Sequence, residues 1–370
     1  MLLRLLQTTL LFHLLQGLFA VDAFALPCCS HGTGNNRLDS SWTDDQEDET
    51  TSSIMSQILS SNRSSLRLLE HINLNVPTQE LILPFYFDIL RCGMDPRKVE
   101  NLASEKKTLW ANCGASQFHL PYGETAQRIP GKIGLLIRPD RWEAFCERVK
   151  KESYSGCIQS YEFRKDRYNR DSVELQFYDN RFICRAGESP VPIHPQPFIQ
   201  LTDTEWGDAV AKRYGGTATD CVGIEYVEFL CPNNTATLIA RFYETVLDAT
   251  VTVTDDDGDQ VAVVAVGNIV DNRADQCLIF RETNNDIPQY DGHHIALYVQ
   301  DFEQAFSKCE KAGVVWINPR FSDKADSLET AKYYQQFRLK DIVDDGQVVF
   351  QLEHEVRCVQ HEAWLGDDAA

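Results

Sequence analysis

The chain has 370 residues, 43% of them hydrophobic, which leaves room for two ordinary domains with real cores. Its formal net charge is −20, from 55 acidic against 35 basic residues, and no run of Lys and Arg is interleaved with aromatic residues. An acidic surface repels nucleic acid and anionic membranes, so both are excluded as partners.

The first 25 residues are predicted to be a signal peptide. Arg4 precedes a nearly unbroken apolar centre, and Ala23 and Ala25 have the small-residue spacing that signal peptidase prefers. A membrane anchor is the alternative, but His13 and Gln16 interrupt the run and its apolar core is short. No later segment approaches the roughly 18 consecutive apolar residues of a spanning helix. We therefore expect a soluble mature protein without stable membrane association. The junction around Phe24 also resembles the cleavage signature of plastid presequences in algae with secondary plastids, so a plastid and secretion are equal candidate destinations.

Residues 26–66 are rich in Ser, Thr, Asn and Asp and are predicted to be a disordered linker. The 12 cysteines of the chain are scattered, with no C-x-x-C pair, and their even number permits disulfides in a secreted protein. Several of them, such as Cys146 and Cys184, lie in apolar runs, where a buried free thiol is the usual interpretation.

From residue 67 onward, the succession of strand, helix and further strands occurs four times. The first module has a strand near 68–77, a helix near 79–91 whose Pro84 lies in the first turn or bends it, and strands 107–114 and 116–121.

The remaining three modules follow the same order. The second has strand 131–139, helix 140–152 and strands near 158–163, 172–177 and 181–186. The third has strand 223–232, helix 235–247 and strands 250–254, 261–267 and 276–282. The fourth has strand 292–300, helix 301–313 and strands 314–319, 333–341 and 348–356.

The alignments indicate that one pair of modules is copied as a block, because HINLNVP aligns with YVEFLCP and GKIGLLI with GHHIALY at similar offsets. This predicts a first domain at 67–187, a Pro-rich hinge at 188–220, a second domain at 221–360 and a tail at 361–370.

A β-α-β-β-β module with a Phe-Tyr pair in its helix resembles the repeat of the vicinal-oxygen-chelate (VOC) superfamily. The resemblance is carried by HINLNV…PFYFDIL, YVEFLCP…RFYETVL and HHIALYVQDFEQAF, and it covers nearly all of the chain after residue 67. It implies an α+β fold of four βαβββ modules in two glyoxalase-like domains with curved mixed sheets. Because the superfamily includes glyoxalases, dioxygenases, bleomycin-resistance proteins and non-catalytic binders, the fold alone does not settle the function.

The resemblance also implies a divalent metal, Zn, Ni, Fe or Mn, held by the first and last strands of two modules. Four-module relatives pair module one with module four and module two with module three. Under that pairing the predicted ligands are His71, His119, His294 and Glu353, with Gln117, Gln351 and Glu355 as alternates. A second, degenerate site would contain Ile133, Ile183, Tyr226 and Leu278. The competing interpretation of each histidine is a hydrogen-bonded structural residue, and strand alternation points His293 and His354 away from the site.

The implied activity is that of a glyoxalase-like lyase or isomerase, acting on a small dicarbonyl-derived substrate through a metal-stabilised enediolate with Glu353 as general base. Asn75, Gly123 and Tyr290 stand where the family has its glutathione contacts, so the sequence departs from the usual glutathione recognition. One alternative is a non-catalytic small-ligand binder. The other is an extradiol-type dioxygenase, which needs a histidine where Tyr226 stands. We expect a small-molecule substrate and a monomer with paired internal modules.

Overall fold

The computed structural model describes residues 64–103, 107–151, 156–165, 170–189, 191, 220–256, 258–271 and 273–361. The predicted signal peptide and most of the predicted linker, hinge and tail lie outside these residues. None of the helices in the described part of the chain is long and apolar enough to span a membrane.

The order of elements reproduces the four predicted modules. The first contains β1 (Leu66–Asn73), α3 (Gln79–Ile82), η1 (Leu83–Ile89), β2 (Gly93–Met94), η2 (Pro96–Ala103), β3 (Leu109–Cys113) and β4 (Ser116–Leu120). The second contains β5 (Gly131–Ile137), η3 (Pro139–Arg141), α4 (Trp142–Val149), β6 (Ser160–Lys165), β7 (Asp171–Phe177) and β8 (Asn180–Ala186). The third contains β9 (Cys221–Pro232), α6 (Ala236–Val246), β10 (Val251–Asp256), β11 (Asp259–Val270) and β12 (Arg273–Thr283). The fourth contains β13 (His294–Val299), α7 (Phe302–Lys311), α8 (Leu328–Tyr334), β14 (Gln336–Asp344) and β15 (Gln347–Cys358).

Two predicted elements differ from the structure. The strand predicted at 314–319 is wrong: only Val315 forms a single bridge, to Leu339, and an unpredicted helix, α8, follows. The helix predicted at 79–91 begins as α3 and continues as the π-helix η1. Pro84 lies in the first turn of η1, where its missing N–H removes a donor from the regular helical pattern.

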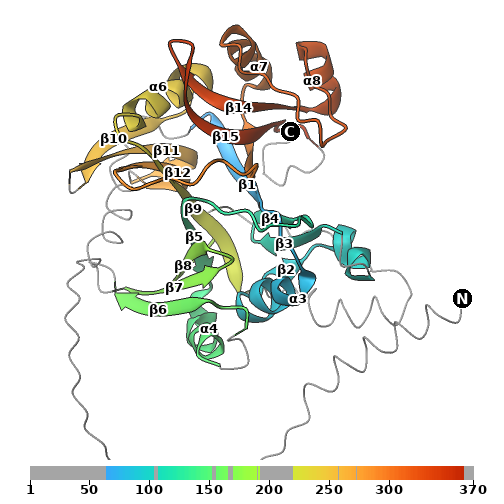
Figure 1. Cartoon of the computed structure of the whole chain (residues 1–370), viewed down its shortest axis with the longest axis vertical. Helices are drawn as coiled ribbons and strands as arrows, with labels where there is room; N and C mark the ends of the chain where they lie inside the picture. Colours follow the sequence, from blue (N-terminus) through green and yellow to red (C-terminus); the bar gives the residue numbers. More distant parts are fainter. Residues whose placement is uncertain are drawn as a thin grey trace, which may run out of the picture. The chain divides into compact units, whose positions relative to one another are not determined.

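The strands form two mixed sheets, which confirms the predicted α+β fold class (Figure 1). The seven-stranded sheet has the order β14-β15-β13-β1-β4-β3-β2, and the eight-stranded sheet has the order β10-β11-β12-β9-β5-β8-β7-β6. Strands of the first module therefore pair with the fourth, and strands of the second with the third, as the resemblance implied. Each half of the chain contributes to both sheets, and the predicted domain boundaries themselves stay a prediction.

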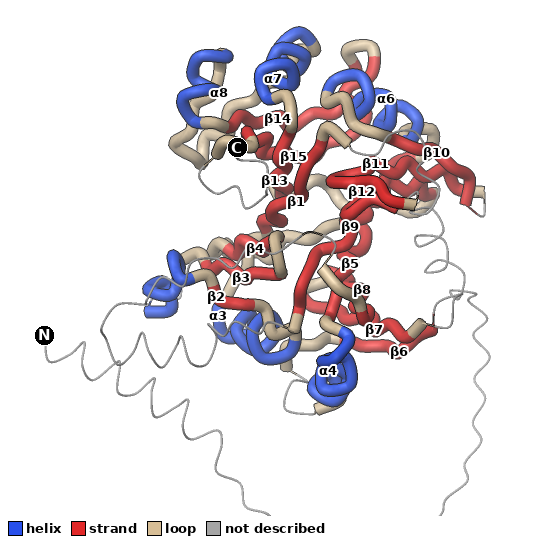
Figure 2. The backbone as a smooth tube through the Cα atoms, turned by 180° about the vertical axis from the view of Figure 1, so that it is seen from behind, coloured by secondary structure: helices blue, strands red, loops and turns tan. Residues whose placement is uncertain are grey.

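Helices cover one face of the sheets. In the fourth module, α7 lies over β14 (Figure 2). Phe306 of α7 packs edge-on against Phe337 of β14, with ring centroids 5.2 Å apart. The two sheets are also joined by Gln276 of β12, whose side-chain nitrogen donates to Leu69 O, Ser116 Oγ and Ile224 O at 2.9–3.3 Å.

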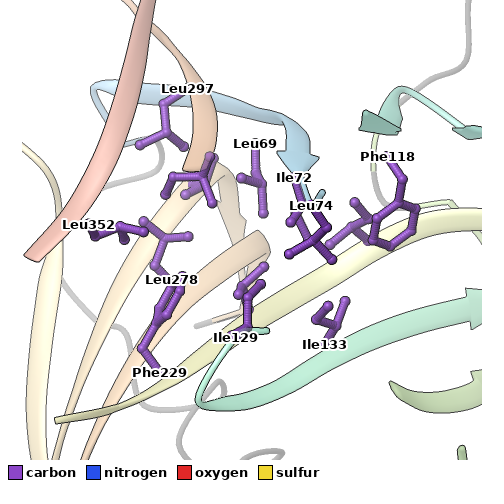
Figure 3. Close-up of a cluster of buried hydrophobic side chains, with 14 of the residues drawn as sticks. Leu69, Ile72, Leu74, Phe118, Ile129, Ile133, Phe229, Leu278, Leu297 and Leu352 are labelled. Atoms are coloured by element: carbon purple, nitrogen blue, oxygen red, sulfur yellow. The ribbon is translucent and has the colours of Figure 1, made fainter. Parts of the chain in front are cut away.

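The main apolar core lies on the helix-covered face. Alternate residues of a strand point to opposite faces, so Val227 and Phe229 join this core while Tyr226 joins a smaller cluster on the other face. Figure 3 shows residues of both sheets in the main core, among them Leu69 of β1 with Leu278 of β12. The opposite face of the seven-stranded sheet carries the polar side chains of His71 and His294 beside a small cluster that contains Leu68 and Tyr298.

Candidate metal centre

Three potential ligands converge on that polar face of the seven-stranded sheet. One nitrogen each of His71 and His294 and one carboxylate oxygen of Glu355 all lie within 4.8 Å of one another. The two Nε2 atoms are 3.4 Å apart, and His294 Nε2 is 3.9 Å from Glu355 Oε2. The three residues come from β1, β13 and β15, so the group is built across the first and fourth modules.

The register of these strands explains the convergence. His71 of β1 lies opposite Ala296 of β13, and Ala296 lies opposite Glu355 of β15. Side chains at directly opposed positions share a face of the sheet. Because the central residue is an alanine, the longer side chains on either side can meet over it, together with His294 two residues away.

His71 is oriented by its neighbour in the sequence. Its Nδ1 donates to Glu70 Oε2 at 2.7 Å, and Glu70 is itself held by Arg357 at 2.7 and 2.8 Å. A proton on Nδ1 leaves the lone pair of Nε2 facing His294. A carboxylate behind the imidazole is the usual support of a metal-binding histidine, because it sets the tautomer and increases the basicity of the ligand nitrogen.

Burial sets the protonation states of the group. It lowers the pKa of His71 to about 3 and holds the pKa of His294 well below its usual value, so both imidazoles are neutral. Burial alone would raise the pKa of Glu355, but Arg357 and Arg338 together hold it well below its usual value. Two neutral imidazoles and an ionised carboxylate fit a divalent ion such as Zn, Ni, Fe or Mn.

The charges around the group also suit a cation. Arg338 donates to Glu355 Oε2 at 2.5 Å and to Glu353 Oε1 at 2.8 Å, and it pairs with Asp323 at 2.9 Å. Arg357 joins Glu355 Oε1 at 2.6 Å to Glu70. The side chains of this network carry four carboxylates against two guanidinium groups, a formal excess of two negative charges. A divalent cation would balance that excess.

The predicted ligand His119 lies beside the group and is not one of its three converging ligands. Its ring stacks on His71, with centroids 3.7 Å apart, and on Trp110 at 4.2 Å. His119 Nε2 donates to Gln117 Oε1 at 3.0 Å, while Gln117 Nε2 donates to Asp95 at 3.0 Å. His119 therefore packs against His71, and Gln117 holds His119 in place; these two residues are called the wall beside His71 below.

The other predicted positions are placed as follows. Glu353 is buried and accepts from Asn318 Nδ2 at 3.0 and 2.9 Å as well as from Arg338, and burial raises its pKa. Gln351 is exposed and donates to Asp341 at 2.8 Å, away from the histidines. As expected, His354 faces the core, where its Nε2 is 2.6 Å from Tyr243 Oη.

The loop between α7 and α8 covers the centre. The Phe321 ring meets His294 edge-on at 5.7 Å and lies 4.0 Å from the Arg338 guanidinium. Beneath it, His71 is 1% exposed, and His294 and Glu355 are each 3% exposed. The three ligand side chains are therefore shielded from solvent in this structure.

Two positions of the predicted degenerate second site, on β5 and β12, are wrong by one residue. Ile183 and Tyr226 share a cluster, but Ile133 and Leu278 belong to the main core on the other face of the eight-stranded sheet. The register places Gly134 opposite both Tyr226 and Ile183, and Cys277 opposite Tyr226. Period-two alternation turns a one-residue error into the wrong face.

Several residues of the centre were not found from the sequence. Glu70, Asn318, Phe321, Arg338 and Arg357 were not predicted, and Glu355 was only an alternate. Glu70 had a usable signal, because an acidic residue directly precedes a predicted ligand. Asn318 and Phe321 lie in or just after the segment that was wrongly predicted as a strand.

Comparison with known proteins gives matches among solved structures. No protein-family model matches the chain, and no curated protein matches it. A dioxygenase candidate from Bacillus subtilis subsp. subtilis str. 168 is 14% identical, over 79% of this chain and 85% of that one, with a TM-score of 0.48. A point mutant of glyoxalase I from Zea mays is 13% identical over 80% and 93%, with a TM-score of 0.43.

A point mutant of homoprotocatechuate 2,3-dioxygenase from Brevibacterium fuscum is 14% identical, over 81% of this chain and 73% of that one, with a TM-score of 0.27. The strand order of this chain, with module one paired with module four and module two with module three, matches the VOC-type fold that the sequence resemblance implied.

Proposed function

We propose that this VOC-type protein is a metal-dependent lyase or isomerase of the glyoxalase kind, acting on a small substrate with two adjacent oxygens. The observation that supports it is the buried group of His71, His294 and Glu355, whose donor atoms lie within 4.8 Å of one another. A divalent ion bound there would supply Lewis acidity toward the two oxygens of the substrate.

The chain's own residues would orient and deprotonate the substrate. Glu353 lies on the same face of β15 as Glu355, and burial raises its pKa, which makes it a stronger proton acceptor than an ordinary glutamate. Asn318 and Arg338 hold both of its oxygens in place. Asn318 belongs to the covering loop, so loop movement would free one side of the carboxylate for substrate.

A second candidate is an oxygen-using dioxygenase. The observation that favours it is the composition of the group, since two histidines and one carboxylate with open positions are typical of non-haem Fe(II) oxygenases. Here the set would lie in modules one and four, so the tyrosine at position 226 is no obstacle to it.

Metal analysis of the full chain tests the proposal. The wild type, H71A, H294A and a control, H293A, are stripped with a chelator and then incubated with Zn, Ni, Fe(II) or Mn. His293 directly precedes His294 but bonds to Asp291 at 2.7 Å outside the group. We expect the wild type and H293A to retain metal after gel filtration, and H71A and H294A to lose it.

Turnover then separates the two candidates. The lyase predicts isomerisation of the methylglyoxal hemithioacetal or another dicarbonyl adduct, whereas the dioxygenase predicts oxygen uptake with Fe(II) and a catechol. Metal that stays bound after loss of both histidines would refute the site. A metal-free wild type that still binds small ligands would favour a non-catalytic binder.

A further inference from the structure

Three cysteines meet in the core, away from the candidate metal centre. The Sγ atoms of Cys92, Cys113 and Cys221 lie within 4.8 Å of one another, and those of Cys92 and Cys113 are only 3.3 Å apart. All three side chains are at most 3% exposed. The residues come from the ends of three elements: before β2, at the end of β3 and at the start of β9.

The register explains the closest pair. In the antiparallel pair of β2 and β3, Gly93 lies opposite Asn112 and Met94 opposite Ala111. One step further along the same register places Cys92 opposite Cys113. Directly opposed residues of antiparallel strands have Cα atoms about 4.5–5.5 Å apart, which is within the range that a disulfide spans.

The third thiol is brought in by a close backbone approach. Gly114 follows Cys113 with φ +62°, and a Cβ on it would lie 2.0 Å from the carbonyl oxygen of Val222. Only a glycine fits at this contact, and it places Cys221, the neighbour of Val222, beside the end of β3.

The burial of the three cysteines favours a disulfide over a bound metal ion. Burial raises the pKa of Cys92 and Cys113 well above the usual value, so both are neutral thiols. Cys221 differs, because hydrogen bonds from Cys113 and Cys92 lower its pKa. A soft metal ion would need thiolates at all three positions, including Cys92 and Cys113, whose deprotonation burial opposes. A disulfide is uncharged and needs no such deprotonation in the folded state.

We propose that Cys92 and Cys113 form a disulfide, beside which Cys221 remains a thiol. The bond forms by thiol–disulfide exchange with an oxidised low-molecular-weight disulfide such as glutathione disulfide. The two thiols are oxidised to one S–S bond, and the donor is reduced to two thiols that carry away both protons and both electrons. Because the pair is buried, exchange takes place during folding or transient opening.

The bond has a structural consequence for the wall beside His71. It closes a loop that contains Asp95 and Trp110, the residues that hold Gln117 and stack on His119. β2 has two residues and lies at the edge of its sheet, so this loop has few other strand contacts to hold it.

Peptide mapping of the full chain tests the proposal. The protein is refolded with reduced and oxidised glutathione, denatured, alkylated without reductant and digested with trypsin. We expect peptides 92–97 and 108–128 to be linked, and peptide 214–241, which contains Cys221, to carry alkylated cysteines. C221S and the control C277S, which removes a buried thiol of the other sheet, should keep the link, and C92S and C113S should lose it.

Three results would overturn the proposal. The first is alkylation of Cys92 and Cys113 in the refolded, oxidised wild type. The second is a link from either residue to Cys221 as the main product. The third is a zinc or copper ion, bound in a stoichiometric amount and lost in C92S, that protects all three thiols from glutathione disulfide.

Discussion

The Glu70 carboxylate offers a sharp test of the candidate metal centre, through the variant E70Q. Glutamine keeps an oxygen that can accept from His71 Nδ1, where the native contact is 2.7 Å, so the ring should hold its tautomer. What the variant removes is the negative charge behind the imidazole. Arg357 loses one partner but keeps Glu355 at 2.6 Å, so no buried guanidinium is left unpaired.

The expected loss of metal affinity in E70Q follows from the role of Glu70 as the carboxylate behind His71. Loss of a carboxylate that supports a metal-bound histidine weakens metal affinity by about 10–100-fold, or about 1.4–2.7 kcal/mol. We expect E70Q to fall in this range and to remain folded. Removal of the ligand itself, in H71A, should be more severe, because it takes away a donor atom.

A matched control lies in the second sheet. Glu225 is buried, directly precedes Tyr226 as Glu70 precedes His71, and pairs with Arg185 as Glu70 pairs with Arg357. Competition with a chromogenic chelator measures affinity, and circular dichroism checks the fold. The reasoning is refuted if folded E70Q binds metal as tightly as the wild type, or if E225Q weakens binding equally.

Three further predictions concern the buried polar groups. R338M should destabilise the metal-free protein by about 3–5 kcal/mol in urea unfolding, because it removes the one guanidinium that Glu353 and Glu355 share and leaves Arg357 alone to balance the charge of the group. Bound metal should reduce this loss, and an equal loss with and without metal would contradict the charge argument. Y243F should cost about 1–3 kcal/mol, because it removes the 2.6 Å contact to His354, without changing metal affinity. Acid should destabilise the metal-free protein, because burial lowers the pKa of four histidines. These are His71, His119, His294 and His354, and the pKa of the last falls to about 4. Below about pH 6.5 the unfolded chain binds more protons than the folded protein, so the free energy of unfolding should fall as the pH drops from about 6.5 towards 4. The loss should be up to about 1.4 kcal/mol per pH unit for each histidine. An unfolding midpoint that stays constant between these pH values would refute this prediction.

The covering loop shows why part of the centre could not be predicted from the sequence. Residues 314–319 are largely apolar and begin with two valines, which favours a strand locally, but they pair with β14 only through the single bridge of Val315 to Leu339. After this bridge the chain leaves β14, so that Asn318 binds Glu353 and Phe321, just beyond the segment, lies against the His294 imidazole. These contacts join residues far apart in the sequence and leave no periodic pattern.

The sequence by itself determined the modules, since alternating apolar residues, helical periodicity and a repeated order of elements are local properties of the chain. It also determined that the good ligand types, His71 and His294, occur on the first strands of the first and fourth modules. Only the tertiary structure decided which atoms meet. The opposed positions of His71, Ala296 and Glu355 bring two imidazoles and one carboxylate together, whereas His119 turns to stack on its neighbour. Strand register and the packing of the covering loop make that choice, because a step of two residues keeps a side chain on the same face but changes the group it contacts.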